Sequence, residues 1–167
     1  ESAVVSNVSE DAAAYTIDLL AGASDSDNSD TLNIADLTLT GGDASGITVN
    51  GNSLEVDPNV YNFLAMGEPE VITYSYTVED GNGGSVGQTA TITITGANDA
   101  PSVSSAVTSI ASEDDSGYSI DLLTGASDPD TSDTLNISGL ILTGGDASGV
   151  TVNGNSLDVE PNVYNSL

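Results

Sequence analysis

The sequence contains no Lys, Arg or His, and this absence dominates its physical chemistry. The 167 residues include 26 Asp and Glu, so the formal net charge is −26. No side-chain salt bridge can therefore form, and the carboxylates must be neutralised by cations from solution. Nucleic acid is excluded as a partner, because phosphate binding requires basic side chains and this surface repels phosphate.

Other absences narrow the class of protein further. There is no Cys, which excludes disulfides and thiolate metal sites. No stretch approaches the roughly 18 apolar residues of a spanning helix, so we expect no membrane insertion. Without His, Lys or Cys, acid–base catalysis could use only a pair of carboxylates, as in glycosidases. No such pair lies in a recognisable cleft, and the acidic loops repeat, so the sequence predicts a protein that is not an enzyme.

The chain consists of two copies of one unit. Residues 15–64 and 118–167 align over 50 positions with 39 identities, at a period of 103 residues. A unit of this size is an ordinary domain. We expect a complete repeat at 1–99 and a second repeat at 100–167 that stops before its last strands. Its unfinished sheet edge would leave it less stable or favour strand exchange with another chain.

Alternating apolar and polar residues predict short strands throughout the unit. Residues 72–78 and 90–95 alternate most clearly, with Thr or Ser at every second position, and predict two long antiparallel strands. Asn50-Gly51 is a strong hairpin signal. The alternation of apolar residues changes phase near Ala35-Asp36, which predicts a bulge there. Residues 57–64 break the alternation and favour a short helical turn. About seven strands in 103 residues predict an all-β, immunoglobulin-like Greek-key sandwich with the tyrosines in its core.

Two segments carry a resemblance to a known family. The run Tyr74–Gly84, followed by a Thr/Ile strand and by Gly96-Ala97-Asn98-Asp99-Ala100-Pro101, resembles the bacterial cadherin-like and VCBS-type repeats of large RTX-class adhesins. The resemblance covers the whole unit. It implies Ca²⁺ bound at the joints between successive repeats. Where the cadherin joint begins with Asp this chain has Gly96, which implies fewer ions per joint, or water in place of a ligand.

The resemblance also implies which residues bind the metal. At the joint between the two repeats the matching positions are Glu10, Asp57, Asn98, Asp99, Asp128 and Asp130. At a joint to a preceding repeat they are Asp25, Asp27 and Asp80.

The chemistry of the side chains favours a calcium site without reference to the family resemblance. The chain offers only oxygen ligands, which Ca²⁺ prefers, and two carboxylates about 4 Å apart repel by roughly 4 kcal/mol at an effective dielectric near 20. The spacing Asp25-x-Asp27-x-x-Asp30 recurs with all carboxylates intact in the second repeat. Alternatives remain for each feature: the acidic loops could be solvated surface, and Asn98-Asp99 and Asp80-Gly81 could be simple turns.

These observations predict an extender repeat, rigidified by calcium, in the stalk of a bacterial adhesin. Such a protein would contribute to cell adhesion or biofilm formation and would be extracellular or on the bacterial cell surface, with neighbouring repeats of the same chain as partners. The alternative is a ligand-binding module of the same kind of adhesin, for carbohydrate, a cell surface or ice. Near duplication of the unit favours the extender.

Overall fold

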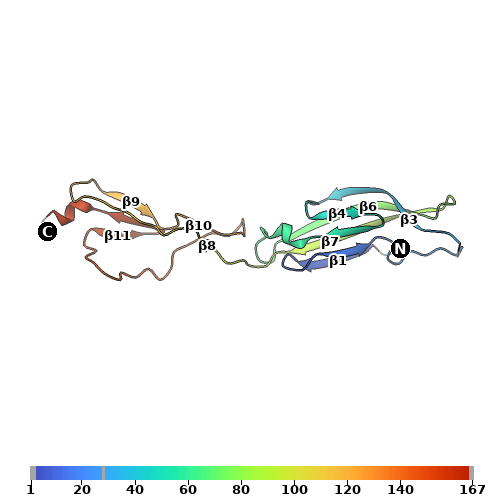
Figure 1. Ribbon diagram of the computed structural model, residues 1–167, viewed down its shortest axis with the longest axis horizontal. Coiled ribbons are helices and arrows are strands. Elements are labelled where there is room, and N and C mark those ends of the chain that lie inside the picture. Colours follow the sequence, from blue (N-terminus) through green and yellow to red (C-terminus); the bar gives the residue numbers. More distant parts are fainter. Residues whose placement is uncertain (1–2, 28, 166–167) are drawn as a thin grey trace. The chain divides into compact units, whose positions relative to one another are not determined.

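The computed structural model describes residues 3–27 and 29–165 and is all-β (Figure 1). It divides into two compact units. Unit 1 comprises Glu1–Asp99 and Pro129–Ser132, and unit 2 comprises Ala100–Asp128 and Asp133–Leu167. The only helices in the described ranges are two single 3₁₀ turns, Pro58–Tyr61 (η1) and Pro161–Tyr164 (η2). None of these described helices could cross a membrane.

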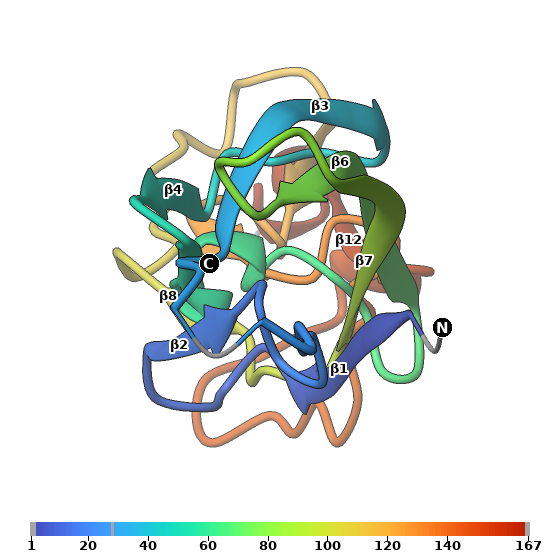
Figure 2. The same ribbon diagram turned by 90° about the vertical axis from the view of Figure 1, so that its right-hand side faces the viewer.

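Unit 1 is a sandwich of two sheets, as predicted. One sheet has the order β1-β7-β6-β3 and the other β2-β5-β4. In chain order the strands are β1 (Val4–Ser9), β2 (Tyr15–Asp18), β3 (Asn33–Gly41), β4 (Ile47–Asn50), β5 (Ser53–Val56), β6 (Pro69–Glu79) and β7 (Ser85–Thr95). The pair β1–β7 is parallel and all other pairs are antiparallel. Seen end-on, β3, β6, β7 and β1 form one layer, with β2 and β4 in the facing layer (Figure 2). The connectivity is that of an immunoglobulin-like Greek key.

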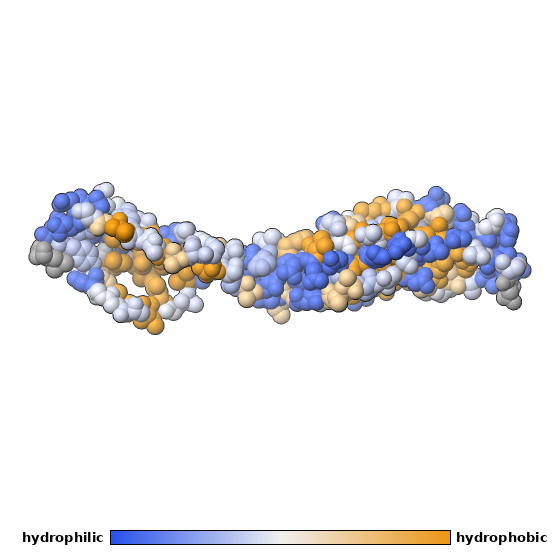
Figure 3. Space-filling model, in the orientation of Figure 1, coloured by the Kyte–Doolittle hydropathy of each residue, from blue (hydrophilic) through white to orange (hydrophobic). Residues whose placement is uncertain are grey.

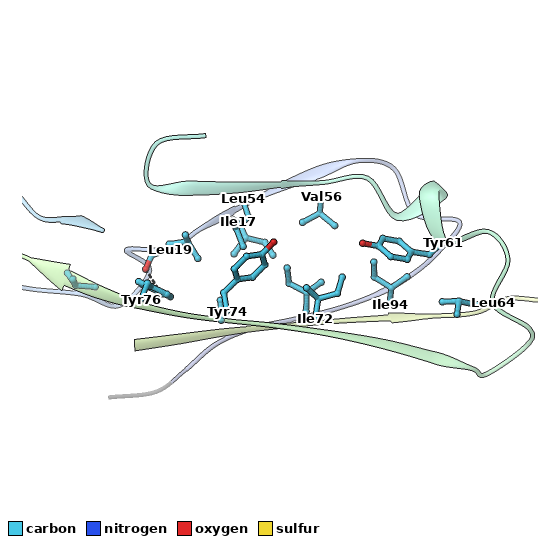
Figure 4. Packing of buried hydrophobic residues seen from close by; sticks show 13 residues of the cluster. Ile17, Leu19, Leu54, Val56, Tyr61, Leu64, Ile72, Tyr74, Tyr76 and Ile94 are labelled. Atoms are coloured by element: carbon cyan, nitrogen blue, oxygen red, sulfur yellow. Dashed lines mark hydrogen bonds between the residues drawn. The ribbon is translucent and has the colours of Figure 1, made fainter. Parts of the chain in front are cut away.

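The core lies between the two layers and follows the predicted period of two. On β6 the buried residues Ile72, Tyr74 and Tyr76 alternate with half-buried Thr and Ser. They face Leu54 and Val56 of β5 across the sandwich (Figure 4). Apolar burial of this kind is the main stabilising contribution to such a fold.

Two tyrosines use the hydroxyl end of the side chain to join the layers. Tyr61 of η1 is fully buried, donates to the carbonyl of Asp43 at 2.8 Å and accepts from the Gly46 amide at 3.0 Å. The Tyr76 hydroxyl donates to the Leu19 carbonyl at 2.7 Å. Because these polar tips are satisfied inside the protein, Tyr61 and Tyr76 belong to the core and not to an exposed stacking platform. Tyr74 is also buried, whereas Tyr15, Tyr118 and Tyr164 are half-buried.

The hairpin predicted at Asn50-Gly51 forms, but one residue further along the chain. Asn50 pairs with Ser53, which leaves Gly51-Asn52 as the two-residue loop, with Gly51 at φ +59°. The Asn52 side-chain oxygen accepts the Ile34 amide at 3.1 Å. Two-residue hairpin loops need positive φ at their first position, which Gly51 adopts without the steric cost of a Cβ, and this gives a physical reason for the shifted turn.

The predicted bulge in β3 is confirmed at Asp36. The register with β6 shifts between Ala35 and Thr38, and Asp36 has φ 53°. At the matching position the second repeat has Gly139 at φ 66°. Glycine adopts this left-handed backbone without the steric cost that a Cβ brings.

Unit 2 contains fewer strands. Its sheets are β11-β12-β9 and β10-β8, formed by β8 (Ser102–Val103), β9 (Tyr118–Asp121), β10 (Ala126–Ser127), β11 (Val150–Asn153) and β12 (Ser156–Val159). Residues 136–144, which match β3, contain no strand, and Leu140, Ile141 and Leu142 are exposed. The lower stability expected for this repeat stays a prediction.

Replacement of Asp36 by Gly should stabilise unit 1 by about 0.5–1 kcal/mol, because glycine relieves the left-handed strain that the second repeat already avoids. Asp36→Val should destabilise it by more than about 1 kcal/mol, because a β-branched residue resists positive φ. Urea unfolding of the full chain measures both. Thr38→Gly is the control, and if it matched Asp36→Gly the bulge would not be the cause.

Candidate metal centre

Three carboxylates from distant parts of the sequence converge in unit 1. One oxygen each from Glu10, Asp99 and Asp130 lies within 4.8 Å of the others. Glu10 directly follows β1, and its amide donates to the Thr95 carbonyl of β7 at 3.1 Å. Asp99 lies four residues beyond the end of β7. The parallel β1–β7 pair therefore delivers two of the three carboxylates to the same end of the sandwich.

The third carboxylate arrives on a short loop of the second repeat that packs with unit 1. The Thr131 amide and hydroxyl both donate to the Phe63 carbonyl, at 3.0 and 3.2 Å. The Ser132 hydroxyl donates to Glu68 Oε2 at 3.2 Å. Asp130 Oδ2 accepts the Asp99 amide at 3.0 Å. The loop is held by backbone and hydroxyl groups, so its carboxylate is positioned without any ion pair.

Two of the three carboxylates in this cluster are buried, unlike the acidic side chains usually found on a protein surface. Glu10 is 0% exposed and Asp130 is 1% exposed. Glu10 Oε1 accepts the Ala97 amide at 2.7 Å. Its other oxygen, Oε2, is buried with no hydrogen-bond partner in the described part of the chain. A buried carboxylate oxygen left in this way costs free energy unless a proton or a cation satisfies it.

Burial and neighbouring negative charges disfavour the ionised form of Glu10 when no cation is bound. Burial raises the pKa of Glu10 above its usual value, and the charges of Asp130 and Asp99 raise it further. Hydrogen bonds from the Ala97 and Leu64 backbone oppose the shift. At the separation found here each pair of carboxylates repels by about 3 kcal/mol at an effective dielectric near 20. A divalent cation would reverse the sign of this interaction.

Two further side chains support the site and were not found from the sequence. Asn62, just after η1, donates from Nδ2 to Asp99 Oδ2. Glu68 accepts the Ala65 amide at 3.2 Å as well as the Ser132 hydroxyl. The recurrence of Asn62 as Asn165 was the only signal for it in the sequence.

Three of the residues expected at this joint lie outside the converged group. Asn98 is exposed, and its Nδ2 donates to the Asp99 carbonyl at 2.8 Å. Asp57 caps η1 through the Asn59 amide at 3.3 Å. Asp128 belongs to unit 2 and is half-buried.

A second acidic group lies on the loop between β2 and β3. Carboxylate oxygens of Asp25, Asp27 and Asp30 lie within 4.8 Å of one another, but the first two residues are exposed. Asp25 Oδ1 accepts the Asp27 amide at 2.8 Å. This end of unit 1 is largely hydrophilic (Figure 3).

Asp80 was expected to join this second group. Its Oδ1 accepts the amides of Asn82 at 2.7 Å and Gly84 at 2.9 Å, so the residue caps its own turn. Asp80 and Asp25 line one cavity, together with Leu32 and Val78.

The fold and this buried acidic cluster define an immunoglobulin-like module with an oxygen-rich centre at one end. Residues 1–95 match the family model of the cadherin-like domain, and the chain belongs to that family. No curated protein matches the chain. Cadherin-like domains are adhesion-type structural modules that generally bind Ca²⁺.

Substituting Glu10 by Gln should have opposite effects without and with calcium. The raised pKa means that the ionised carboxylate destabilises the fold above that pKa. In chelator at pH 7 the neutral variant should therefore be more stable than the wild type. In millimolar calcium it should be less stable than the wild type, because one ligand is lost.

Urea unfolding in the two conditions measures this reversal of sign. Glu79→Gln, which removes an exposed carboxylate at the end of β6, is the matched control and should change little in either condition. A change of stability that is the same with calcium and with chelator would contradict the role of Glu10 as an ion ligand.

Proposed function

We propose that the chain is an extender repeat, rigidified by Ca²⁺, from the stalk of a bacterial surface or secreted adhesin of the RTX class. One observation carries the proposal. The Glu10 carboxylate is fully buried, with Oε2 unpartnered and with Asp99 and Asp130 oxygens within 4.8 Å. No cationic side chain exists in the sequence to neutralise this group.

The residues present fit a calcium ion. Calcium takes six to eight oxygen ligands with flexible geometry, from carboxylates, amide carbonyls, backbone carbonyls and water. Glu10, Asp99 and Asp130 would hold it directly, and Asn62 would orient the Asp99 carboxylate. When bound, the ion supplies charge neutralisation and a crosslink between ligands. No chemical reaction follows from the site.

The mechanical role follows from where the ligands lie in the sequence. Glu10 and Asp99 belong to the first repeat, whereas Asp130 lies 31 residues beyond Asp99, in the second repeat. An ion held by all three would fasten the beginning of the second repeat to the end of the first. Without the ion, Pro129–Ser132 would keep its hydrogen bonds to Asp99, Phe63 and Glu68, but the Asp130 carboxylate would be repelled by those of Glu10 and Asp99.

A similar joint would connect the first repeat to a repeat that precedes it. Asp27 occupies in the first repeat the position that Asp130 has in the second. We propose that Asp25 and Asp27, with Asp80 beside them, serve a joint to a preceding repeat. Neighbouring repeats of the same chain are thus the partners of this module. A site of this kind suits the millimolar calcium outside cells, so we assign the protein to the extracellular space or cell surface, in adhesion or biofilm formation.

Calcium should raise the melting temperature of the full chain when its concentration goes from micromolar to millimolar. One site at 100 times its Kd adds about 2.7 kcal/mol to the free energy of unfolding. Differential scanning calorimetry with calcium and with chelator measures the shift, and magnesium at the same ionic strength is the control. A melting temperature that does not respond to chelator would contradict the calcium site.

Removing a ligand should loosen the connection between repeats while the first repeat stays folded. Asp99→Asn and Asp130→Asn remove one charge each at nearly constant side-chain volume. Small-angle scattering in millimolar calcium should show a flexible pair for both variants and a particle of fixed shape for the wild type. Asp11→Ala, which removes an exposed carboxylate beside the site, is the control. Equal scattering profiles for all four proteins would show that the ion does not set the geometry.

A further inference from the structure

The outward side of the β1-β7-β6-β3 sheet differs from the rest of this acidic surface. Its centre consists of alternating residues of two neighbouring strands, which we call the hydroxyl face: Thr73, Ser75 and Thr77 of β6, and Thr89, Thr91 and Thr93 of β7. All six carry a hydroxyl group and none carries a charge. The residues between them, such as Ile72 and Ile92, are buried in the core.

Pairing arranges these side chains in rows across the sheet. Thr91 lies opposite Thr73 and beside Val5 of β1, and Thr93 lies opposite Val71. Thr89 lies opposite Ser75, whose other neighbour is Thr38 of β3. Residues paired in this way project from the same side of a sheet. The rows therefore form one continuous uncharged surface of hydroxyl and methyl groups.

Carboxylates occur only at the margins of this side. On the central and edge strands of this sheet the described carboxylates are Glu70 and Glu79, near the two ends of β6, and Asp36, at the bulge of the edge strand β3. Glu70 Oε1 accepts the Asp43 amide. The opposite sheet is different, because Glu55 lies between Thr16 and Thr48 in its central row. The second repeat keeps a carboxylate there as Asp158. Threonine is favoured in all strands, so strand propensity alone does not explain why only one sheet lacks charge.

The net charge of the chain indicates which partner can dock on the hydroxyl face. With a net charge of −26 and no basic side chain, two copies repel wherever carboxylates meet. The hydroxyl face is the side of the described sandwich on which this repulsion is least. A hydroxyl can both donate and accept a hydrogen bond, so the rows are complementary to themselves. The Thr77 hydroxyl already donates to the Ala35 carbonyl at 3.2 Å and keeps its acceptor side. A contact between identical patches is the usual form of a two-fold pair.

We propose that the hydroxyl face is a lateral docking surface for a second copy of this chain, so that repeats pack side by side. Strand spacing and rise give a patch of about 15 Å by 20 Å, or roughly 600 Å² buried in total. Such an area is below that of stable dimers and implies weak association for one pair of repeats. A long array would add many such contacts and gain avidity. The contact uses none of the proposed calcium ligands.

The absence of Cys permits a direct test on the full chain, because an introduced thiol is the only one present. Thr91→Cys places a thiol at the centre of the hydroxyl face, and Thr16→Cys places one on the opposite sheet. With a short bismaleimide crosslinker, the crosslinked dimer should be at least about five times more abundant for Thr91→Cys. Thr16 is the more exposed of the two, so accessibility favours the control. Labelling with a monofunctional maleimide checks that both thiols react.

Two further measurements test whether the hydroxyl face itself forms the contact. Adding Thr73→Asp to the Thr91→Cys protein should lower the dimer yield several-fold, whereas Thr48→Asp, on the opposite sheet, should leave it within about twofold. Raising salt should increase the yield for Thr91→Cys, because the Debye length falls from about 30 Å at 0.01 M to about 3 Å at 1 M. Equal yields for the two cysteine proteins, or equal losses from the two aspartates, would overturn the proposal. Neither outcome would bear on calcium binding.

Discussion

Uncompensated negative charge is the constraint on which the rest of this structure depends. A chain with 26 carboxylates and no basic side chain cannot neutralise an acidic group internally. Several of its carboxylates avoid the problem by lying at turns outside the core, where they cap backbone amides, as Asp80 does. Glu10 does not avoid it, because it is buried beside Asp99 and Asp130. A fold whose total stability is about 5–15 kcal/mol has little reserve for such a cluster. A cation from solution would resolve the conflict, as we propose for calcium.

Much of the fold could be predicted from the sequence because it depends on local patterns. The period of two located β6 and β7, and the change of phase located the bulge at Asp36. What could not be predicted depends on long-range contacts. The Asn52 side chain of the hairpin loop, for example, accepts the Ile34 amide of the other sheet, a contact between residues 18 apart in the sequence. The parallel pairing of β1 with β7 has no local signal at all.

The candidate site shows the same division between local and long-range information. Glu10, Asp99 and Asp130 could be proposed from the family resemblance, and the fold brings them together. Sequence alone could not show that Glu10 Oε2 would be buried without a partner, or that Asn62 would bond Asp99. Asp57, an expected ligand, lies outside the converged group and caps η1, because an acidic residue just before Pro58 can accept the free Asn59 amide of that turn. Only tertiary packing decides which acidic residues converge.

The most direct test of the central claim is a count of bound metal. Equilibrium dialysis of the full chain against millimolar calcium, followed by elemental analysis, gives the number of ions per chain. The account predicts that the wild type binds calcium and that a double variant, Glu10→Gln with Asp130→Asn, binds at least one ion fewer while its β-sheet circular dichroism is unchanged. Equal calcium content in the two proteins, or none in the wild type, would contradict it.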